Sequence, residues 1–308
     1  MTSKPALTTW LLLLTLGVMW GFSFLAVELA LPGFAPLQIA ALRIAIAAVI
    51  VTAASFALGD RLPPSSSPAG RRIWLHCFGM AIFSNALPFS LLSWAQLNVN
   101  SGFAGISMAV VPLMVLPLAH IFVPGEHLTR RKLTGFLMGF AGVVILIGPA
   151  KILAGTGTGL ESIARLACVL ASCSYACGAI TTRTAPKGPA LAFSAAALIL
   201  ASLIMLPLAF IQSPLPSAPP TDAILAILYL AVFPTALATL MLVHIIKTAG
   251  PSFLSLVNYQ IPIWAVLFGM VFLNEALPAS FLAALGLILL GMAISQGRRK
   301  LRGALQDG

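Results

Sequence analysis

The sequence predicts an all-α membrane protein of ten transmembrane helices, built as two inverted five-helix repeats around a central cavity. Three observations predict this class: a very apolar composition, ten apolar runs of spanning length, and similarity between the two halves of the chain. The 308 residues are 60% hydrophobic and 8% charged, whereas soluble domains carry about 25% charged residues. Because each span needs about 20 apolar residues, ten spans leave no room for a soluble domain.

Proline, glycine and charged residues bound the apolar runs, and each run is assigned to one spanning helix. The first run is too long for a signal-peptide core and lacks an A-x-A-type cleavage site, so we treat it as a helix. The ten predicted spans are Leu7–Val27, Leu37–Leu58, Ile73–Gln96, Phe103–Val123, Leu133–Ile147, Ile163–Thr182, Leu191–Ile211, Ala223–Ile246, Phe253–Leu273 and Ala279–Ser295.

The basic residues are divided unevenly between the connecting loops. If the N-terminus is cytoplasmic, 14 of the 17 Lys and Arg residues lie on that side, against two, Lys151 and Arg165, on the other, with Arg43 inside a span. Lys and Arg accumulate in cytoplasmic loops, so we expect a multi-pass protein of the bacterial inner (plasma) membrane with both termini cytoplasmic. The net charge of +10 then reflects topology and anionic lipid, and no nucleic-acid partner is expected.

The third and fourth spans match the eighth and ninth at an offset of 150 residues. At that offset Phe83 aligns with Phe233 and Pro112 with Pro262, and after a slip of one residue Glu126 aligns with Glu275. Five helices per unit is an odd number, so the second unit must insert upside down, as in many secondary transporters. The predicted repeats are residues 1–153 and 154–308.

Several motifs are similar to those of one family. They are Trp20-Gly21-Phe22-Ser23-Phe24, Pro36 with Arg43, Pro112 through Pro117 leading to Gly125-Glu126-x-Leu128, and Pro262 leading to Asn274-Glu275-x-Leu277 with Gly286 and Gly291. With them the chain resembles the drug/metabolite transporter superfamily, specifically its ten-helix EamA-type transporters. The resemblance implies a monomer with a central cavity, alternating access, and often export. The branch it favours is the amino-acid exporters, including those for aromatic amino acids.

Polar and aromatic side chains inside spans should face the bundle interior or a cavity, because lipid cannot satisfy their hydrogen bonds. Asn258 and Tyr259 stand just before Pro262, whose ring frees a backbone carbonyl one turn earlier. The alternative is that such groups only hydrogen-bond helix to helix. The candidate substrate-binding residues are Trp20, Ser23, Asn85, Pro88, Met108, Tyr175, Thr239, His244, Asn258 and Tyr259.

Arg43 is the one charge well inside a span. It could anchor a substrate carboxylate, or it could pair with Glu28 or snorkel toward the external interface; the sequence favours the structural interpretation. Glu126 and Glu275 precede the fifth and tenth spans, where a carboxylate stabilises a helix N-terminus, so we expect both to be structural. His244 lies deep enough that its imidazole could carry a proton.

Charged residues that the spans lack disfavour two classes of substrate. The first span has no carboxylate at its middle, which disfavours cationic drugs, and the middles of the eighth and ninth spans have no Lys or Arg, which disfavours phosphates. We therefore predict an exporter or facilitator of small neutral or zwitterionic metabolites, with amino acids favoured, working by alternating access. No cofactor, metal site, catalytic residue or nucleotide-binding motif is predicted, and the chain is not expected to be an enzyme. The alternatives are a lipid-scrambling or structural membrane protein of the same fold, or an exporter of other drugs or metabolites.

Overall fold

The computed structural model describes residues 6–147, 159–249, 251–254 and 256–296. All regular structure in these ranges is helical. The predicted boundary between the repeats, at residues 153 and 154, lies outside the described residues. So do six of the basic residues used to assign the topology: Lys4, Lys151, Arg298, Arg299, Lys300 and Arg302.

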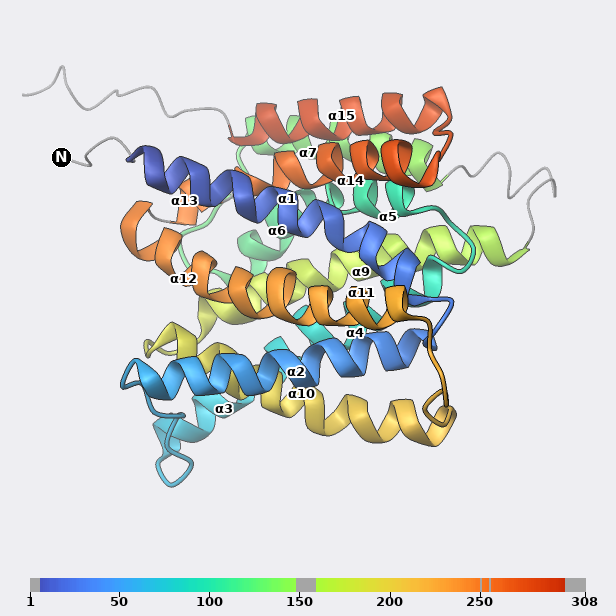
Figure 1. Cartoon of the computed structure of the whole chain (residues 1–308). Helices are drawn as coiled ribbons and strands as arrows, with labels where there is room; N and C mark the ends of the chain where they lie inside the picture. The colour runs from blue at the N-terminus through green and yellow to red at the C-terminus, as the bar shows by residue number, and fades with distance from the viewer. Residues whose placement is uncertain (1–5, 148–158, 250, 255, 297–308) are drawn as a thin grey trace, which may run out of the picture.

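Each predicted span corresponds to a helical stretch (Figure 1). Seven stretches of the described chain are long and apolar enough to cross a membrane; α14 and α15 are shorter apolar helices, and α7 begins with three basic residues. The elements of the first half are α1 (Leu7–Ala30), α2 (Pro36–Ala57), α3 (Pro68–Met80), η1 (Ala81–Ala86), α4 (Leu87–Ala95), α5 (Ser101–Ser107), α6 (Val110–Phe122) and α7 (Arg130–Ile147). Those of the second half are α9 (Gly159–Thr184), α10 (Ala190–Gln212), α11 (Thr221–Ala231), η2 (Val232–Leu237), α12 (Ala238–Ala249), α13 (Pro251–Leu254), α14 (Val257–Leu273) and α15 (Ala279–Gln296).

The third and eighth spans, expected as uninterrupted helices, each contain one π-helical segment. In η1 the N–H of Leu87 bonds to the carbonyl of Ile82, and in η2 the N–H of Ala238 bonds to that of Phe233, both five residues back. A single π turn inside an α-helix marks functional sites more often than chance. The two segments begin at equivalent places in the two halves of the chain.

The fourth and ninth spans are also interrupted, between α5 and α6 and between α13 and α14. At the first break the N–H groups of Met108 and Val111 bond three residues back, to Gly105 and Met108. At the second, the N–H of Tyr259 bonds to Leu256, again three residues back. Both halves therefore contain one span with a π-helical segment and, directly after it, one span with a break.

The first helices of the two halves run in opposite directions. In Figure 1, α1 runs from the left end of the bundle to the right, whereas α9 runs from right to left. The connection between α2 and α3 lies at the left end and that between α10 and α11 at the right end. These directions are those expected of inverted repeats.

Helices α7 and α15 pack closely through glycine. A side chain at Gly135 would overlap the carbonyl oxygen of Gly291, and one at Gly291 would overlap that of Gly135. Small residues allow such close contact between helix backbones in a membrane, where there is no hydrophobic force between helices. Gly135 and Gly291 therefore serve the packing of these two helices.

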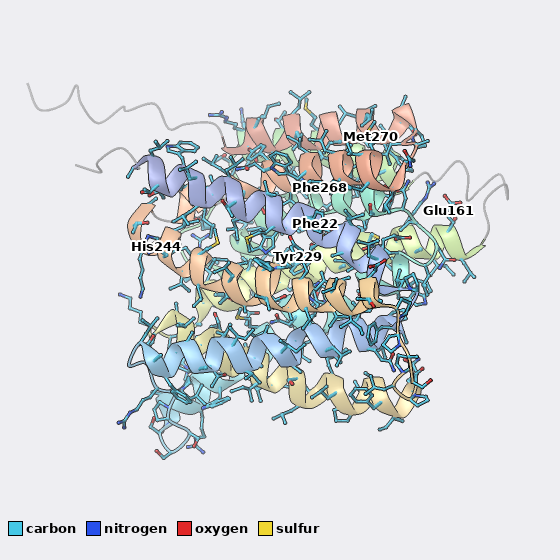
Figure 2. The ribbon with its side chains drawn as sticks, in the orientation of Figure 1. Phe22, Glu161, Tyr229, His244, Phe268 and Met270 are labelled. Atoms are coloured by element: carbon cyan, nitrogen blue, oxygen red, sulfur yellow. The ribbon has the colours of Figure 1, made fainter. Side chains whose placement is uncertain are left out.

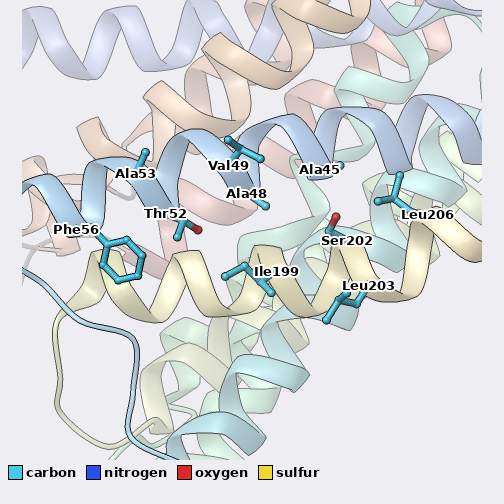
Figure 3. A pocket seen from close by; sticks show the side chains of 10 residues that line it. All are labelled: Ala45, Ala48, Val49, Thr52, Ala53, Phe56, Ile199, Ser202, Leu203 and Leu206. Atoms are coloured by element: carbon cyan, nitrogen blue, oxygen red, sulfur yellow. The ribbon is translucent and has the colours of Figure 1, made fainter.

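A shallow groove lies between α2 and α10 (Figure 3). Its volume is about 590 Å³, and apolar side chains dominate its lining: Ala45, Ala48, Val49, Thr52, Ala53, Phe56, Ile199, Ser202, Leu203 and Leu206. Val49 and Leu203 are among the most exposed of these. An exposed apolar surface on a spanning helix is the surface that lipid acyl chains cover.

We expect Gly135→Ala to lower the thermal stability of the detergent-solubilised protein, by about 1–3 kcal/mol, because the added methyl group forces α7 and α15 apart. The matched control is Gly286→Ala on α15, where a side chain meets no atom within 4 Å. Equal unfolding temperatures for the two variants would contradict the close contact.

Candidate functional site

Backbone carbonyls in and just before η2 accept hydrogen bonds from side chains. Pro234 has no N–H to give to the carbonyl of Leu230, and the Thr235 hydroxyl donates to that carbonyl instead, at 2.7 Å. The indole Nε1 of Trp20, on α1, donates to the carbonyl of Pro234 at 3.0 Å. Trp20 therefore ties α1 to the middle of the eighth span.

A tyrosine next to η2 makes a second tie to α1. The hydroxyl of Tyr229, on α11, donates to the carbonyl of Met19 at 3.2 Å. Its ring packs edge to face against Phe22 with centroids 4.9 Å apart, and Phe22 packs in the same way against Phe268 of α14 (Figure 2). Aromatic rings therefore connect α1, α11 and α14 beside Trp20.

The η1 segment is held in an equivalent way. Asn85 is buried, and its Nδ2 donates to the carbonyl of Met80, five residues back, at 3.2 Å. The hydroxyl of Ser174, on α9, donates to the carbonyl of Phe83 at 2.9 Å. A carbonyl in each π-helical segment thus accepts a hydrogen bond from a side chain of the opposite half of the chain.

Arg43 lies between these segments. Both structural interpretations expected for it, an ion pair with Glu28 and snorkelling toward the external interface, were wrong. Its side chain is 5% exposed, so it does not snorkel, and no acidic residue of the described chain forms an ion pair with it. Its Nε and Nη2 lie 3.3 and 3.0 Å from the Thr235 hydroxyl, and its guanidinium lies 3.8 Å from the ring centroid of Phe89. Glu28, the expected partner, instead accepts from Gln96 Nε2 at 3.4 Å.

Four spans contribute to the surroundings of Arg43. Phe89 comes from α4 and packs against Tyr175 of α9, with ring centroids 6.4 Å apart. Tyr175 and Tyr229 also lie in the neighbourhood of the guanidinium. Helix α2, which carries Arg43, contacts both η1 and η2. Of the predicted residues, Trp20, Asn85 and Tyr175 are therefore brought to one region.

The other predicted residues on these helices are engaged in local structure. The hydroxyl of Ser23 donates to the carbonyl of Trp20 at 2.6 Å, and that of Thr239 to the carbonyl of Thr235 at 2.6 Å. Pro88 and Met108 are buried, and Met108 belongs to the main hydrophobic core. These four side chains support the helices that carry the site.

Three further predicted residues lie on α12 and α14. Asn258 and Tyr259 are half-buried in the first turn of α14, directly after the break that separates it from α13. His244 is exposed on α12, near the left end of the bundle in Figure 2. The imidazole of His244 therefore lies on the surface of the bundle.

Sequence reasoning missed Phe89, Tyr229 and Ser174. Tyr229 and Ser174 are polar groups within apolar runs, so the rule that selected Tyr175 would also have selected them. Phe89 gives no such signal, because a phenylalanine in a membrane span normally contacts lipid or core.

Glu275, in the connection between α14 and α15, binds the start of α5 at the right-hand end of the bundle in Figure 1. Its carboxylate oxygens accept from the backbone N–H groups of Ser101 and Gly102, at 2.7 and 2.8 Å, at the start of α5. The expectation that Glu275 serves the N-terminus of its own following helix was therefore wrong. Nearby, Arg165 pairs with Glu161 and lies beside the rings of Phe103 and Phe281.

Glu126, the counterpart of Glu275, is bound differently. Its carboxylate pairs with Arg183 at 2.6 Å and with Lys132 at 3.0 Å. The hydrogen bonds from Arg183 and then from Lys132 hold the pKa of the Glu126 carboxyl below its ordinary value of 4.5. This ion pair joins the connection between α6 and α7 to the end of α9.

The lowered pKa predicts a pH-dependent contribution to stability. A carboxyl group whose pKa is lower in the folded than in the unfolded protein stabilises the folded state at pH values above its unfolded pKa. This contribution is lost as the pH falls through its folded pKa. We expect Glu126→Gln to lower the thermal unfolding temperature at about pH 7, by the equivalent of about 0.5–1 kcal/mol for a partly exposed pair. The difference should vanish near about pH 3; a difference of equal size at both pH values would show that packing, not charge, is responsible.

No group of three or more His, Cys, Asp or Glu side chains in the described part of the chain could hold a metal ion. The four cysteines are free thiols. The site therefore consists of hydroxyl, amide and aromatic groups, backbone carbonyls and one guanidinium.

Three relatives are similar over part or most of the chain. An "Uncharacterized transporter" of Archaeoglobus fulgidus is 26% identical over 94% of this chain and 99% of its own length. The "Uncharacterized inner membrane transporter YedA" of Escherichia coli K12 is 25% identical, over 92% and 88%. A "Probable terminal-alkyne amino-acid exporter" of Streptantibioticus cattleyicolor is 26% identical over 46% of each chain.

A solved structure titled "Crystal structure of protein" superposes with a TM-score of 0.65 and covers 94% of this chain and 97% of its own, at 23% identity. The family profile described as "EamA-like transporter family" matches twice, at residues 7–148 and 162–296. With two matches that span nearly all of the described helices, the chain belongs to the EamA-like transporter family, and it is a membrane transporter of small metabolites and not an enzyme.

Proposed function

We propose that this protein is a secondary transporter of small neutral or zwitterionic metabolites, with amino acids as the favoured class, and that it works by alternating access. One observation carries the proposal. The two π-helical segments lie in the middle of spanning helices, and each has a carbonyl that accepts a hydrogen bond from the opposite half of the chain. Irregular backbone at membrane depth is tolerated where it is buried in protein or lines a watery cavity, and transporters place their solute sites beside it.

We further propose that residues 1–153 and 154–308 are the two inverted repeats. Three observations support this division: the twofold match of the family profile, the equivalent positions of η1 and η2, and the opposite directions of α1 and α9. Substrate sites of inverted-repeat transporters lie near the bilayer midplane, where the repeats meet. Trp20, Asn85 and Tyr175, from the first, third and sixth spans, would contribute to such a site.

The chemistry of the side chains favours amino acids. Amide and hydroxyl groups can bind polar atoms of a solute, and aromatic faces such as Trp20 and Tyr175 can hold an ammonium group or an apolar side chain. The name of the S. cattleyicolor relative, an amino-acid exporter by its printed description, supports the same class. Asn258 and Tyr259 would contribute from α14, beside the break in the ninth span.

We also propose that both termini lie in the cytoplasm, on the basis of the 14 basic residues against two, and that the protein is a monomer, as its family resemblance implies. A lipid scramblase of the same fold is the competing function, and it would need a polar path for headgroups. The groove between α2 and α10 is mostly apolar, so it does not provide one.

Transport in liposomes tests the proposal. We expect purified protein in liposomes to take up labelled amino acids from a panel, with rates that saturate with concentration, measured with and without a pH gradient. Saturation is expected because the solute must occupy a finite number of sites. Movement of labelled lipid without saturable solute uptake would contradict the proposal and support the scramblase.

Truncation of a site residue should lower transport without lowering the yield of folded protein. We expect Trp20→Ala and Asn258→Ala each to reduce the initial uptake rate about fivefold to tenfold, roughly the effect of one lost hydrogen bond. Trp10→Ala is the matched control, because Trp10 lies on the same helix and is exposed near its start. Loss of folded protein in the site variants, with normal specific activity in what remains, would instead indicate a packing role.

A further inference from the structure

We propose that Arg43 binds the carboxylate of the transported solute and that the carboxylate, not an ammonium group, is the feature the site selects. This inference rests on the proposed function and names the chemical class of its substrate. Arg43 occupies the eighth position of a 22-residue helix and is 5% exposed. It is therefore a cation held deep within the bundle.

No acidic side chain in the described part of the chain compensates this cation. The described chain contains Glu28, Asp60, Glu126, Glu161, Asp222 and Glu275, and none of them pairs with Arg43. Taking a charge out of water is costly unless a partner charge and hydrogen bonds replace the water. A carboxylate from the solute would supply the missing charge.

The hydrogen bonds of the guanidinium leave N–H donors free for such an anion. Nε and Nη2 both point at one acceptor, the hydroxyl of Thr235. That hydroxyl donates its own proton to the Leu230 carbonyl, so it orients the guanidinium without neutralising it. Among the described residues Nη1 has no hydrogen-bond partner. A guanidinium presents its N–H groups in a fixed fork that matches the two oxygens of a carboxylate.

The scaffold itself does not require a cation at this position. Counted from the first residue of each helix, the position of Arg43 in α2 corresponds to that of Ala197 in α10, a buried alanine. Helix α10 contacts η1 as α2 contacts η2. One half of the protein therefore builds the same contact between a helix and a π-helical segment without any charge.

The groups around Arg43 define the rest of the ligand. The ring of Phe89 stacks on the guanidinium, and its neighbour Tyr175 packs against Phe89, which suits an apolar group next to the carboxylate. No described acidic residue forms an ion pair here that could select an ammonium group. The site is therefore expected to accept an apolar monocarboxylate with or without an amino group, and to reject the matching amide and amine.

Binding to the purified wild-type protein gives the first test, by ligand-induced shifts of the thermal unfolding temperature in detergent. The probes are phenylalanine, phenylacetate, phenylalaninamide and phenethylamine, which share one ring and differ in carboxylate and amine. We expect the two carboxylates to bind on the order of tenfold more tightly than the amide and the amine. Equal binding of phenylalanine and its amide would overturn the inference, whatever the variants do.

Variants of Arg43 give the second test. Arg43→Gln keeps a donor for Thr235 and removes the charge, and we expect it to abolish the preference for carboxylates. Arg71→Gln, which removes an exposed cation near the start of α3, is the control and should retain the preference. A folded Arg43→Gln protein that still prefers carboxylates would overturn the inference; if that variant does not fold, the wild-type probe series decides. Failure of the proposed function would give a different result from failure of this inference. Carboxylates would then bind in detergent, but no solute would show saturable uptake in liposomes.

Discussion

The structure depends on one constraint: a backbone polar group inside the bilayer must find its hydrogen-bond partner within the protein. Two spans depart from the regular α-helix at η1 and η2, and there the spacing of backbone hydrogen bonds changes from four residues to five. The side chains of Asn85 and Thr235 bind carbonyls of their own spans. Ser174 and Trp20 bind carbonyls of the opposite half. The polar side chains in these apolar helices therefore supply the hydrogen bonds that irregular backbone needs at membrane depth.

These bonds also couple the two halves mechanically. Because Trp20 belongs to α1 and its acceptor to η2, the first span cannot move past the eighth without losing that bond, and Ser174 imposes the same condition on the sixth and third spans. A single net hydrogen bond contributes about 0.5–1.5 kcal/mol, which is small enough for thermal motion to exchange. Interhelical hydrogen bonds of this strength hold the two halves in position, but they can break when the halves move.

The sequence predicts the spans because apolarity over about 20 residues is a local property. It also predicts Trp20, Asn85 and Tyr175, because a polar group in such a run must find a partner in the protein. It does not predict which partner. Thr235 lies 192 positions from Arg43 and Ser101 lies 174 from Glu275, and both pairings depend on how the helices pack. The π-helical segments were missed because the residues of Ala81–Ala86 are compatible with an ordinary α-helix, and the change in hydrogen-bond spacing depends on how the helices pack.

Equivalent sequence positions in the two halves have unequal surroundings. Glu275 accepts from two backbone N–H groups of α5, which are fixed by the helix, whereas Glu126 is held by the long side chains of Lys132 and Arg183. The side chain of Arg183 is 49% exposed, and exposed pairs of this kind stabilise proteins little. Charge-assisted bonds to fixed backbone donors are stronger. The end of the bundle that holds Glu275 is therefore tied more firmly than the end that holds Glu126, so in this conformation the two inverted halves are not interchangeable.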